Sequence, residues 1–388
     1  MKRISAVLLS ILVMFLCSAC LDPVQPESYA YVFAIGVDKG EQRSYRYSFM
    51  VQKVGEKSDS GMAGGSEMFS AEGDTLFEAV DIIHSVMAGE VNFMRTGVLV
   101  LGEEVAKSGG AEAFSKISFN SLRMRQSVKM LVAKGSAFEF LKNLESEYRQ
   151  NLTRIQVDLV ISNKIGILPI TSFSIMTEDV QGGRSDPVLT LCAVAKGAAE
   201  GEDNAQDTGG VLRTGGTDSY VMGSALFDGW YMKGTISEKD TMYLLMARGE
   251  LDKGYMTYET SDGKLATLLL EANKDIKTKT DMQNKNIDIK ISLYCTVELD
   301  ETGQIREQWN SKYRQEVEEH IKLQTERIFA ICKELDSDAV GIGDIVSMEF
   351  YDSKEWENYN WKQHYKEFNA SFDVSVELKD KNIRAHMD

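Results

Sequence analysis

A glycine-rich stretch at residues 196–218 (KGAAEGEDNAQDTGGVLRTGGTD) constrains the fold of this chain more than any other feature. Its residues are small and polar, and few of them could contribute to a hydrophobic core. Its acidic run at 200–207 could suggest calcium, but the run lacks the D-x-[DN]-x-[DN]-G spacing of a calcium loop. We therefore interpret 196–218 as a linker or long loop. Each side must then build its own core, as expected for two or three domains in 388 residues.

Short strands are predicted along the first half of the chain. Segment 29–40 (YAYVFAIGVDKG) predicts a strand, and segment 45–51 (YRYSFMV) alternates as a second strand does. Asp38-Lys39-Gly40 between them is typical of a hairpin turn. Segments 97–101 and 127–133 are short apolar runs that predict buried strands. Residues 57–73 are rich in Gly and Ser with little periodicity, so we expect a mobile loop there.

Two capping boxes mark helix starts between these strands. Thr75 and Glu78 form the first, and Ser136 and Glu139 form the second, each followed by apolar residues at helical spacing. Strands and helices therefore alternate through residues 29–195. This alternation predicts an N-terminal α/β region, of one or two subdomains, with helices packed on mixed sheets.

Residues 219–388 predict a second domain of mixed α/β (α+β) type. Asp228-Gly229 is a tight turn signal between two apolar segments. The longest helix candidate is 315–335, whose apolar face is expected to pack on its own sheet, although a partner-binding helix is the alternative. The strands expected in this domain are 220–227, 230–232, 264–272, 286–299 and 372–378.

The first twenty residues have the layout of a secretory leader. Lys2 and Arg3 precede an apolar run that is too short to span a membrane comfortably, and the run ends in Cys17-Ser-Ala-Cys20. Small residues before a cysteine resemble a bacterial lipobox, with Cys17 at the place where Leu is usual. We predict a signal peptide at 1–19, lipidation of Cys20 by fatty acyl chains (palmitate), and a tether at 20–28. An ordinary cleaved signal peptide and a retained anchor helix are the alternatives.

The three downstream cysteines give no sign of a disulfide framework or a zinc site. Cys192, Cys295 and Cys332 are odd in number and widely spaced. At least one must be a free thiol, and we expect it to be buried as a small apolar residue.

The balance of charge limits the partners. Lys and Arg number 43 against 59 Asp and Glu, for a net charge of −16. Such a chain is a poor ligand for nucleic acid, whose affinity comes largely from cations at the phosphates. The same sign disfavours electrostatic docking on an anionic membrane, so a lipid would have to hold the protein there.

Recognisable catalytic equipment is absent from the sequence. It contains no GxxxxGK[ST] loop, no HExxH, no GxSxG elbow and no Cys/His cluster, and we predict no catalytic, metal or cofactor site. The histidines lie far apart; His84 is expected to be packed or solvated, and His320 to be solvated. A cell-wall hydrolase using Glu103 or Glu104 is the enzyme hypothesis, although no partner carboxylate can be identified.

Aromatic residues gather near the end of the chain. Trp356, Tyr359, Trp361 and Tyr365 could form a binding surface. The simpler interpretation is packing between the last helical region and the sheet.

Several motifs, taken in order, resemble the Ger(x)C family, the lipoprotein C subunits of spore germinant receptors. No single motif is specific, but their order agrees over nearly the whole chain. Leu21, Asn120 and Thr190 depart from residues usual in the family (Trp, Arg and Pro), which suggests a divergent member. The motifs are Cys20 with YAYVFAIGVDKG, FMRTGVLVLGEEVAKSG (93–109), MRQSVKMLVAKGSA (124–137), RSDPVLTL (184–191), GSALFDGWYMKG (223–234) and GIGD (341–344) with Trp356 and Trp361.

The resemblance implies a non-enzymatic receptor subunit with several α/β domains, each a sheet flanked by helices, forming a lipid-anchored extracytoplasmic body. Its partners would be two integral membrane subunits, one of them transporter-like. Its location would be the outer surface of the spore's inner membrane. An extracytoplasmic lipoprotein that itself binds a small solute, in a cleft near the linker, remains the alternative function.

Overall fold

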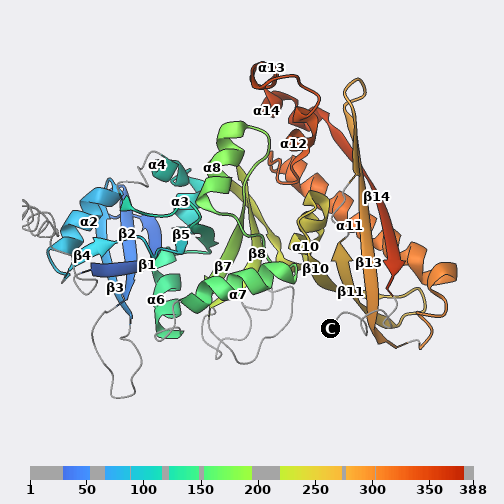
Figure 1. Ribbon diagram of the computed structural model, residues 1–388, viewed down its shortest axis with the longest axis horizontal. Helices are drawn as coiled ribbons and strands as arrows, with labels where there is room; N and C mark the ends of the chain where they lie inside the picture. The colour runs from blue at the N-terminus through green and yellow to red at the C-terminus, as the bar shows by residue number, and fades with distance from the viewer. Residues whose placement is uncertain are drawn as a thin grey trace, which may run out of the picture.

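The computed structural model describes residues 29–52, 66–87, 89–115, 122–147, 153–194, 219–272, 277–301 and 303–379. Within them the chain forms two β-sheets flanked by helices, so the predicted multi-domain, mixed α/β class is confirmed. The molecule is elongated, with the first sheet at the left and centre of Figure 1 and the second sheet at the right.

The first sheet has nine strands, in the order β3-β2-β1-β5-β6-β7-β8-β9, and β4 pairs additionally with β1. Strands β1, β4, β5, β6 and β7 are parallel, whereas β2, β3, β8 and β9 extend the sheet by antiparallel pairing. The strands are β1 (Tyr29–Lys39), β2 (Tyr45–Gln52), β3 (Ser66–Gly73), β4 (Glu90–Asn92), β5 (Val98–Gly102), β6 (Lys129–Ala133), β7 (Val188–Val194), β8 (Ser219–Asp228) and β9 (Tyr231–Ser237).

The predicted hairpin is confirmed as β1 and β2, and the loop predicted next to it is partly wrong. Ser66–Gly73 is the edge strand β3, paired antiparallel with β2 from Tyr45↔Gly73 to Gln52↔Ser66. Most of the Gly and Ser residues that suggested a loop precede this strand in the sequence. At a sheet edge, pairing with one neighbour suffices to form a strand from a segment without a strong apolar pattern. Residues 57–65 lie outside the described residues.

Helices cover both faces of the first sheet. One face packs against α2 (Leu76–His84), α3 (Glu103–Lys107), α4 (Ala111–Ser115) and α8 (Phe173–Gly182). The other packs against α6 (Ala137–Glu147) and α7 (Thr153–Lys164). Neighbouring residues of the parallel strands point into different cores, as alternation along a strand requires: Leu99 into the first core and Val100 into the second.

The first predicted capping box is confirmed, and the second has a different main cap. The Thr75 hydroxyl accepts the Glu78 N–H at 3.2 Å and starts α2. At α6 the Ser136 hydroxyl accepts the Glu139 N–H only at 3.4 Å. The stronger acceptor there is the Asp38 carboxylate, from the end of β1, which takes the N–H groups of residues 137 and 138 at 2.7 and 2.8 Å. This long-range cap fixes α6 to the sheet.

The first sheet continues across the glycine-rich stretch. Residues 196–218 lie outside the described residues, but β7 before them and β8 after them pair antiparallel from Val188↔Leu226 to Val194↔Ser219. The hairpin of β8 and β9 around Asp228-Gly229 is as predicted. The division into domains at this stretch stays a prediction, and the strands on its two sides share one sheet.

The second sheet follows the order β10-β11-β13-β12, with β14 parallel to β13. Strand β13 is long, and its residues alternate between buried and exposed over most of its length. The long helix α11 (Arg314–Glu334) covers one face of this sheet. The strands are β10 (Lys253–Glu259), β11 (Leu265–Ala272), β12 (Lys277–Asp281), β13 (Asn286–Asp300) and β14 (Asn369–Leu378).

Two helices join the sheets into one body. Helix α11 (Arg314–Glu334), preceded by the π-helical turn η2 (Trp309–Tyr313), buries Val317, Ile321 and Ile328 against its own sheet, as predicted. Helix α10 (Glu238–Arg248) is buried at every position from Thr241 to Ala247. Such a helix needs partners all round, and α10 finds them in α11 and in strands of both sheets.

Short helices complete the C-terminal part before β14. They are α12 (Ile342–Ser347), α13 (Ser353–Tyr359), α14 (Trp361–His364) and the 3-10 turn η3 (Tyr365–Glu367). Among the described residues, every helix is too short or too polar to cross a membrane.

Candidate functional site

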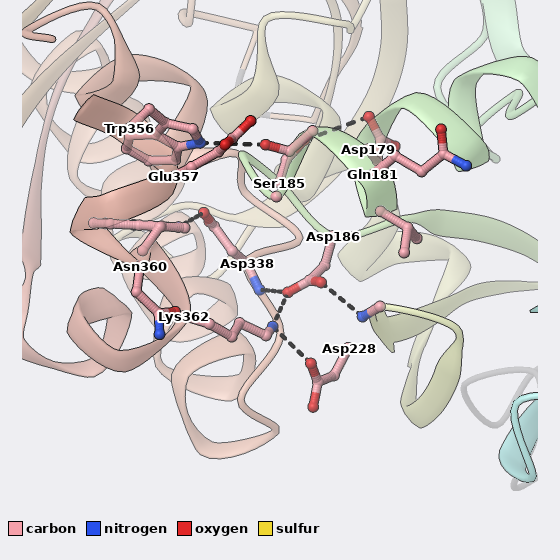
Figure 2. Close-up of a pocket in the computed structure, with 15 residues that line it drawn as sticks. Asp179, Gln181, Ser185, Asp186, Asp228, Asp338, Trp356, Glu357, Asn360 and Lys362 are labelled. Carbon is pink, nitrogen blue, oxygen red and sulfur yellow. Dashed lines mark hydrogen bonds and ion pairs between the residues drawn. The ribbon is translucent and has the colours of Figure 1, made fainter. Parts of the chain in front are cut away.

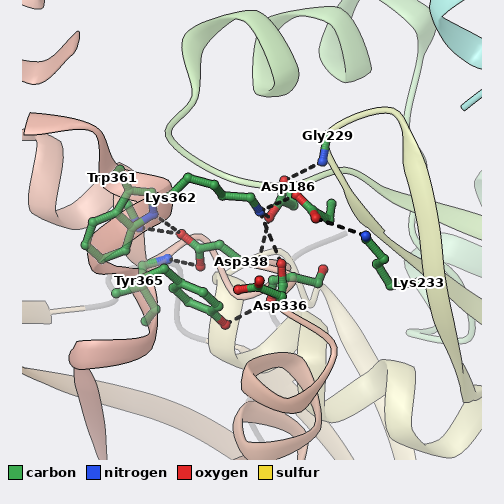
Figure 3. Close-up of polar contacts among 12 residues, drawn as sticks. Asp186, Gly229, Lys233, Asp336, Asp338, Trp361, Lys362 and Tyr365 are labelled. Atoms are coloured by element: carbon green, nitrogen blue, oxygen red, sulfur yellow. Dashed lines mark hydrogen bonds and ion pairs between the residues drawn. The ribbon is translucent and has the colours of Figure 1, made fainter. Parts of the chain in front are cut away.

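Two aspartates join the first sheet to the C-terminal helices. The Asp186 carboxylate, just before β7, accepts the main-chain N–H of Asp338 at 2.7 Å and that of Gly229 at 2.8 Å. The Asp186 N–H donates to the Asp338 carbonyl at 3.1 Å. Both side chains are buried, so these bonds are made where water does not compete. We call this region, with Lys362 and Trp361, the junction (Figure 3).

Asp338 caps helix α12 from inside the junction. Its carboxylate accepts the N–H groups of Gly341, Ile342 and Gly343 at 3.1, 2.8 and 2.7 Å. The indole N–H of Trp361 adds a fourth bond at 2.8 Å. Four donors therefore surround one carboxylate. The first N–H groups of the helix, which lack intrahelical partners, are satisfied here.

Burial works against this carboxylate's charge. It raises the pKa of Asp338 to about 7, and the nearby Asp186 adds to the rise, while the bond from the Gly343 N–H opposes it. The hydrogen bonds from the main chain and from Trp361 favour the ionised form and so oppose the effect of burial. The arrangement is a cap that carries a desolvation cost.

Close packing explains the glycines of the GIGD motif. Gly341 has φ +82°, a left-handed conformation that residues with a Cβ rarely adopt. A Cβ on Gly343 would lie 2.0 Å from the Arg184 carbonyl oxygen and 2.3 Å from the Trp361 Nε1. Only glycine allows these segments to approach so closely.

Lys362 supplies the positive charge of the junction. Its Nζ lies 2.5 Å from the Asp186 carboxylate and 2.8 Å from that of Asp228. Lys233 pairs with Asp228 from the other side at 3.2 Å. Burial alone would lower the pKa of Lys362, but Asp186 and Asp228 raise it, so the lysine stays charged.

The C-terminal aromatic residues pack inside the protein. Trp356, Trp361 and Tyr365 are buried, and the two indoles stack with ring centroids 5.9 Å apart. The Trp356 indole N–H donates to the Gly182 carbonyl at the end of α8 at 3.2 Å. The Tyr365 hydroxyl donates to the Ser337 carbonyl at 2.9 Å. The packing interpretation therefore holds for these three side chains, of which Trp356 and Trp361 also contribute to the lining of a hollow beside the junction.

Two hollows lie beside the junction. The smaller, of about 290 Å³, is lined by the junction residues and by Asp179, Gln181, Glu357 and Asn360 (Figure 2). The larger, of about 900 Å³, lies between α8, α12 and α13 and is mostly polar. Burial raises the pKa of Asp179 to about 6, although the nearby Arg248 opposes the rise. Because Asp186 and Asp338 are occupied by protein donors, they serve the fold rather than a reaction.

Three of the sequence motifs meet here. RSDPVLTL contributes Asp186, GSALFDGWYMKG contributes Asp228 and Gly229, and GIGD forms the start of α12. None of Asp186, Asp338 and Lys362 was predicted to be a functional residue. Asp186 lies inside the motif RSDPVLTL, but Asp338 and Lys362 lie outside the motifs, next to GIGD and Trp361. A motif does not indicate which distant segments it contacts.

The candidate catalytic glutamates lie elsewhere, at the carboxyl ends of the parallel strands. A hollow of about 530 Å³ there is lined by Asp38, Glu103 and Glu104, among others. Glu104 pairs with Lys39 at 2.6 Å and Glu103 with Lys107 at 2.5 Å. The bond from Lys107 lowers the pKa of Glu103, whereas a general acid needs a raised one. The hydrolase hypothesis gains no support from this geometry.

Histidines and cysteines form no metal centre among the described residues, where no group of three or more ligand side chains is placed to hold an ion. Cys192, Cys295 and Cys332 are free and buried, as expected. His84 is exposed and accepts the Val91 N–H. His320 is half-buried with its Nε2 3.3 Å from the Tyr243 hydroxyl, so its predicted solvation is wrong. The reason is that α11 turns this side chain toward Tyr243 of α10.

Cys20, the predicted lipidation site, lies outside the described residues together with the signal peptide and tether. Lipidation of Cys20 stays a prediction.

Comparison with known proteins assigns the chain to a family. The family model described as "Spore germination protein N-terminal domain" matches residues 22–194. The one described as "Spore germination B3/GerAC like, C-terminal" matches residues 222–382. The chain belongs to the Ger(x)C family of spore germination proteins. In this Ger(x)C protein the two matches meet at the glycine-rich stretch, and the junction joins segments of both.

Individual relatives are distant. This Ger(x)C protein is 25% identical to YfkR of Bacillus subtilis (strain 168), whose name assigns it to spore germination, over 202 residues. The alignment spans about half of each protein, 50% of this chain and 51% of YfkR. The crystal structure of the GerBC protein superposes with a TM-score of 0.52 at 13% identity, over 89% of this chain and 97% of that one. That likeness concerns the fold.

Proposed function

We propose that this Ger(x)C protein is a non-enzymatic C subunit of a spore germinant receptor. A lipid on Cys20 holds it at the outer surface of the spore's inner membrane, where it assembles with integral membrane subunits. The observation that carries the proposal is that both halves of the chain match spore germination families, in order. The absence of catalytic motifs from the sequence agrees with it.

The fold supports a positioning role for the protein. The tether between Cys20 and β1 comprises residues 20–28, so its fully extended reach is at most about 30 Å. A lipid at its end keeps the body at high effective concentration beside membrane partners, and weak contacts then suffice for assembly. The junction and α10 hold the second sheet in a fixed position relative to the first.

The decisive experiment compares spores that carry Cys20→Ala with the parent and with Cys192→Ala. The second variant removes a buried thiol by the same substitution. We expect Cys20→Ala to lose the acyl mass, leave the membrane fraction or remain unprocessed, and germinate poorly with at least one nutrient. Cys192→Ala should behave like the parent. Spores that lack the gene for this protein are compared as well. A normal germination response of these spores to every nutrient would overturn the proposal.

Solute binding is the second candidate, because the hollow of about 900 Å³ beside the junction has room for a small molecule. Arg184, Arg248 and Asp344 line it and offer both signs of charge. Calorimetry of the purified protein against amino acids, sugars and nucleosides tests this candidate. A saturable heat of binding that Asp344→Asn abolishes would establish solute binding in this hollow. The absence of a heat of binding for every compound would exclude those classes of solute.

A further inference from the structure

The amino ends of the parallel strands carry a basic hollow. The segment leading into β5 and the segment leading into β6 lie side by side there, because the Lys129 N–H donates to the Gly97 carbonyl and the Gly97 N–H to the Phe33 carbonyl, both at 2.9 Å. The hollow has a volume of about 280 Å³. Its lining comprises Phe33, Met94, Arg95, Thr96, Gly97, Arg125, Ser127 and Lys129. Three of these residues are cations and none is a carboxylate.

The cations of the hollow are open to an anionic ligand. Arg95 is held in place by stacking on the Tyr31 ring, 4.3 Å from its centroid, and by a bond to the Gln52 side chain at 3.3 Å. Among the described residues, no carboxylate pairs with Arg95, Arg125 or Lys129. In a chain with a net charge of −16, three cations without acidic neighbours in one hollow are unusual.

The hollow lies at the edge of the first sheet near which the described chain begins. Tyr29, the first residue of β1, pairs with Glu90 of β4, and Met94 follows two residues after that strand. Met94, an apolar residue of the lining, is 47% exposed.

We propose that this hollow binds the phosphate of an anionic phospholipid in the bilayer that carries the lipid anchor. Arginine forks bind phosphate oxygens in pairs, and Lys129 adds a point charge. Met94 then enters the headgroup region beside the bound phosphate. The acidic remainder of the surface is repelled by the same membrane. The protein is therefore oriented with the amino ends of its strands toward the lipid.

The orientation rests on the proposed anchor, but the hollow can be tested without it. The protein for the test is residues 20–388 with Cys20→Ala, which retains every described element and carries no lipid. It is sedimented with vesicles of phosphatidylcholine alone and of phosphatidylcholine with phosphatidylglycerol. We expect the protein to sediment only with vesicles that contain phosphatidylglycerol. Each cation should contribute about fivefold to the affinity for these vesicles, so the double variant Arg125→Gln with Lys129→Gln should bind them about 25-fold more weakly. Met94→Ser should weaken this binding further.

The matched control, Lys253→Gln with Lys264→Gln, removes two exposed lysines, one at the start of β10 and one just before β11. It should bind like the parent. Equal binding by parent and the Arg125/Lys129 variant would overturn the proposal. So would binding of inorganic phosphate without binding of vesicles, which would make the hollow a site for a free anion. Circular dichroism shows whether each variant is folded. Because Cys20 is absent from all of these proteins, a failure here is distinct from a failure of the lipid anchor.

Discussion

Asp186 and Asp338 exchange hydrogen bonds across 152 residues of sequence: the Asp186 carboxylate accepts the Asp338 N–H, and the Asp338 carbonyl accepts the Asp186 N–H. One aspartate precedes strand β7, and the other precedes the helix α12 that it caps. These two buried hydrogen bonds, one of them to a side-chain carboxylate, therefore help to fix the C-terminal helices against the first sheet.

Removing the Asp338 carboxylate should destabilise the protein strongly. Asp338→Ala leaves three main-chain N–H groups and the Trp361 indole N–H without their acceptor. We expect the free energy of unfolding in urea to fall by about 3 kcal/mol. Glu349→Gln, at an exposed position shortly after α12, should change the free energy of unfolding by less than about 0.5 kcal/mol. Equal stability of the two variants would contradict the role of Asp338 as a cap.

Asp179 should make stability depend on pH in the direction opposite to a salt-bridged carboxylate. Its folded pKa of about 6 lies above the ordinary 3.8, so the native state binds more protons between these values. Its contribution to stability therefore falls as the pH rises through this window. Urea unfolding of the parent and of Asp179→Asn at about pH 4.5 and about pH 7.5 measures the effect. The parent should gain stability relative to the variant at the lower pH; a constant difference would contradict this assignment.

Two glycine-to-alanine changes should behave in opposite ways. In Gly343→Ala the new Cβ meets the Arg184 carbonyl oxygen, and we expect a loss of about 2 kcal/mol. Gly182→Ala, at the end of α8, meets nothing within 4 Å and should be neutral or stabilise by up to about 1 kcal/mol. Thermal unfolding of both variants provides the comparison. An unchanged stability of Gly343→Ala would mean that the start of α12 can move away from Arg184 without loss of stability.

Burial should decide which ion pairs matter. The Lys362 side chain is 40% exposed but its partner Asp186 only 7%, whereas Lys39 and Glu104 are 65% and 67% exposed. Lys362→Met should cost about 2 kcal/mol, because it leaves Asp186 buried without a cation. Lys39→Met should cost at most about 0.5 kcal/mol. Chemical denaturation at low and high salt checks both values, and equal losses would contradict the importance of burial.

Local sequence patterns predicted those elements whose stabilising contacts come from residues nearby in the sequence. The turn at Asp38-Lys39-Gly40 and the alternation of 45–51 predicted the β1–β2 hairpin. The Thr75 capping box predicted α2, and the apolar stripe of 315–335 predicted α11. The edge strand β3 was missed because pairing with β2, rather than its own composition, makes it a strand. The cap of α6 was attributed to Ser136 because the stronger acceptor, Asp38, is 99 residues from the N–H that it binds.

The junction could not be predicted for the same reason. Its contacts join residues that are far apart in the chain, and an aspartate before a proline looks like an ordinary turn residue in sequence. Nor does a sequence distinguish Lys362, which meets two carboxylates, from the many solvated lysines. The basic hollow was hidden by the net charge, which averages over the whole surface and conceals a local excess of cations.

The pairing of β7 with β8 has a consequence for anyone who divides the protein at residues 196–218. Cutting the chain there breaks no hydrogen bond of the ladder, so the two pieces of a nicked molecule should stay together. Expressed separately, each piece would present a bare row of N–H and C=O groups along β7 or β8. Such an edge recruits another strand, so isolated halves should self-associate, and mixing them should restore a soluble complex.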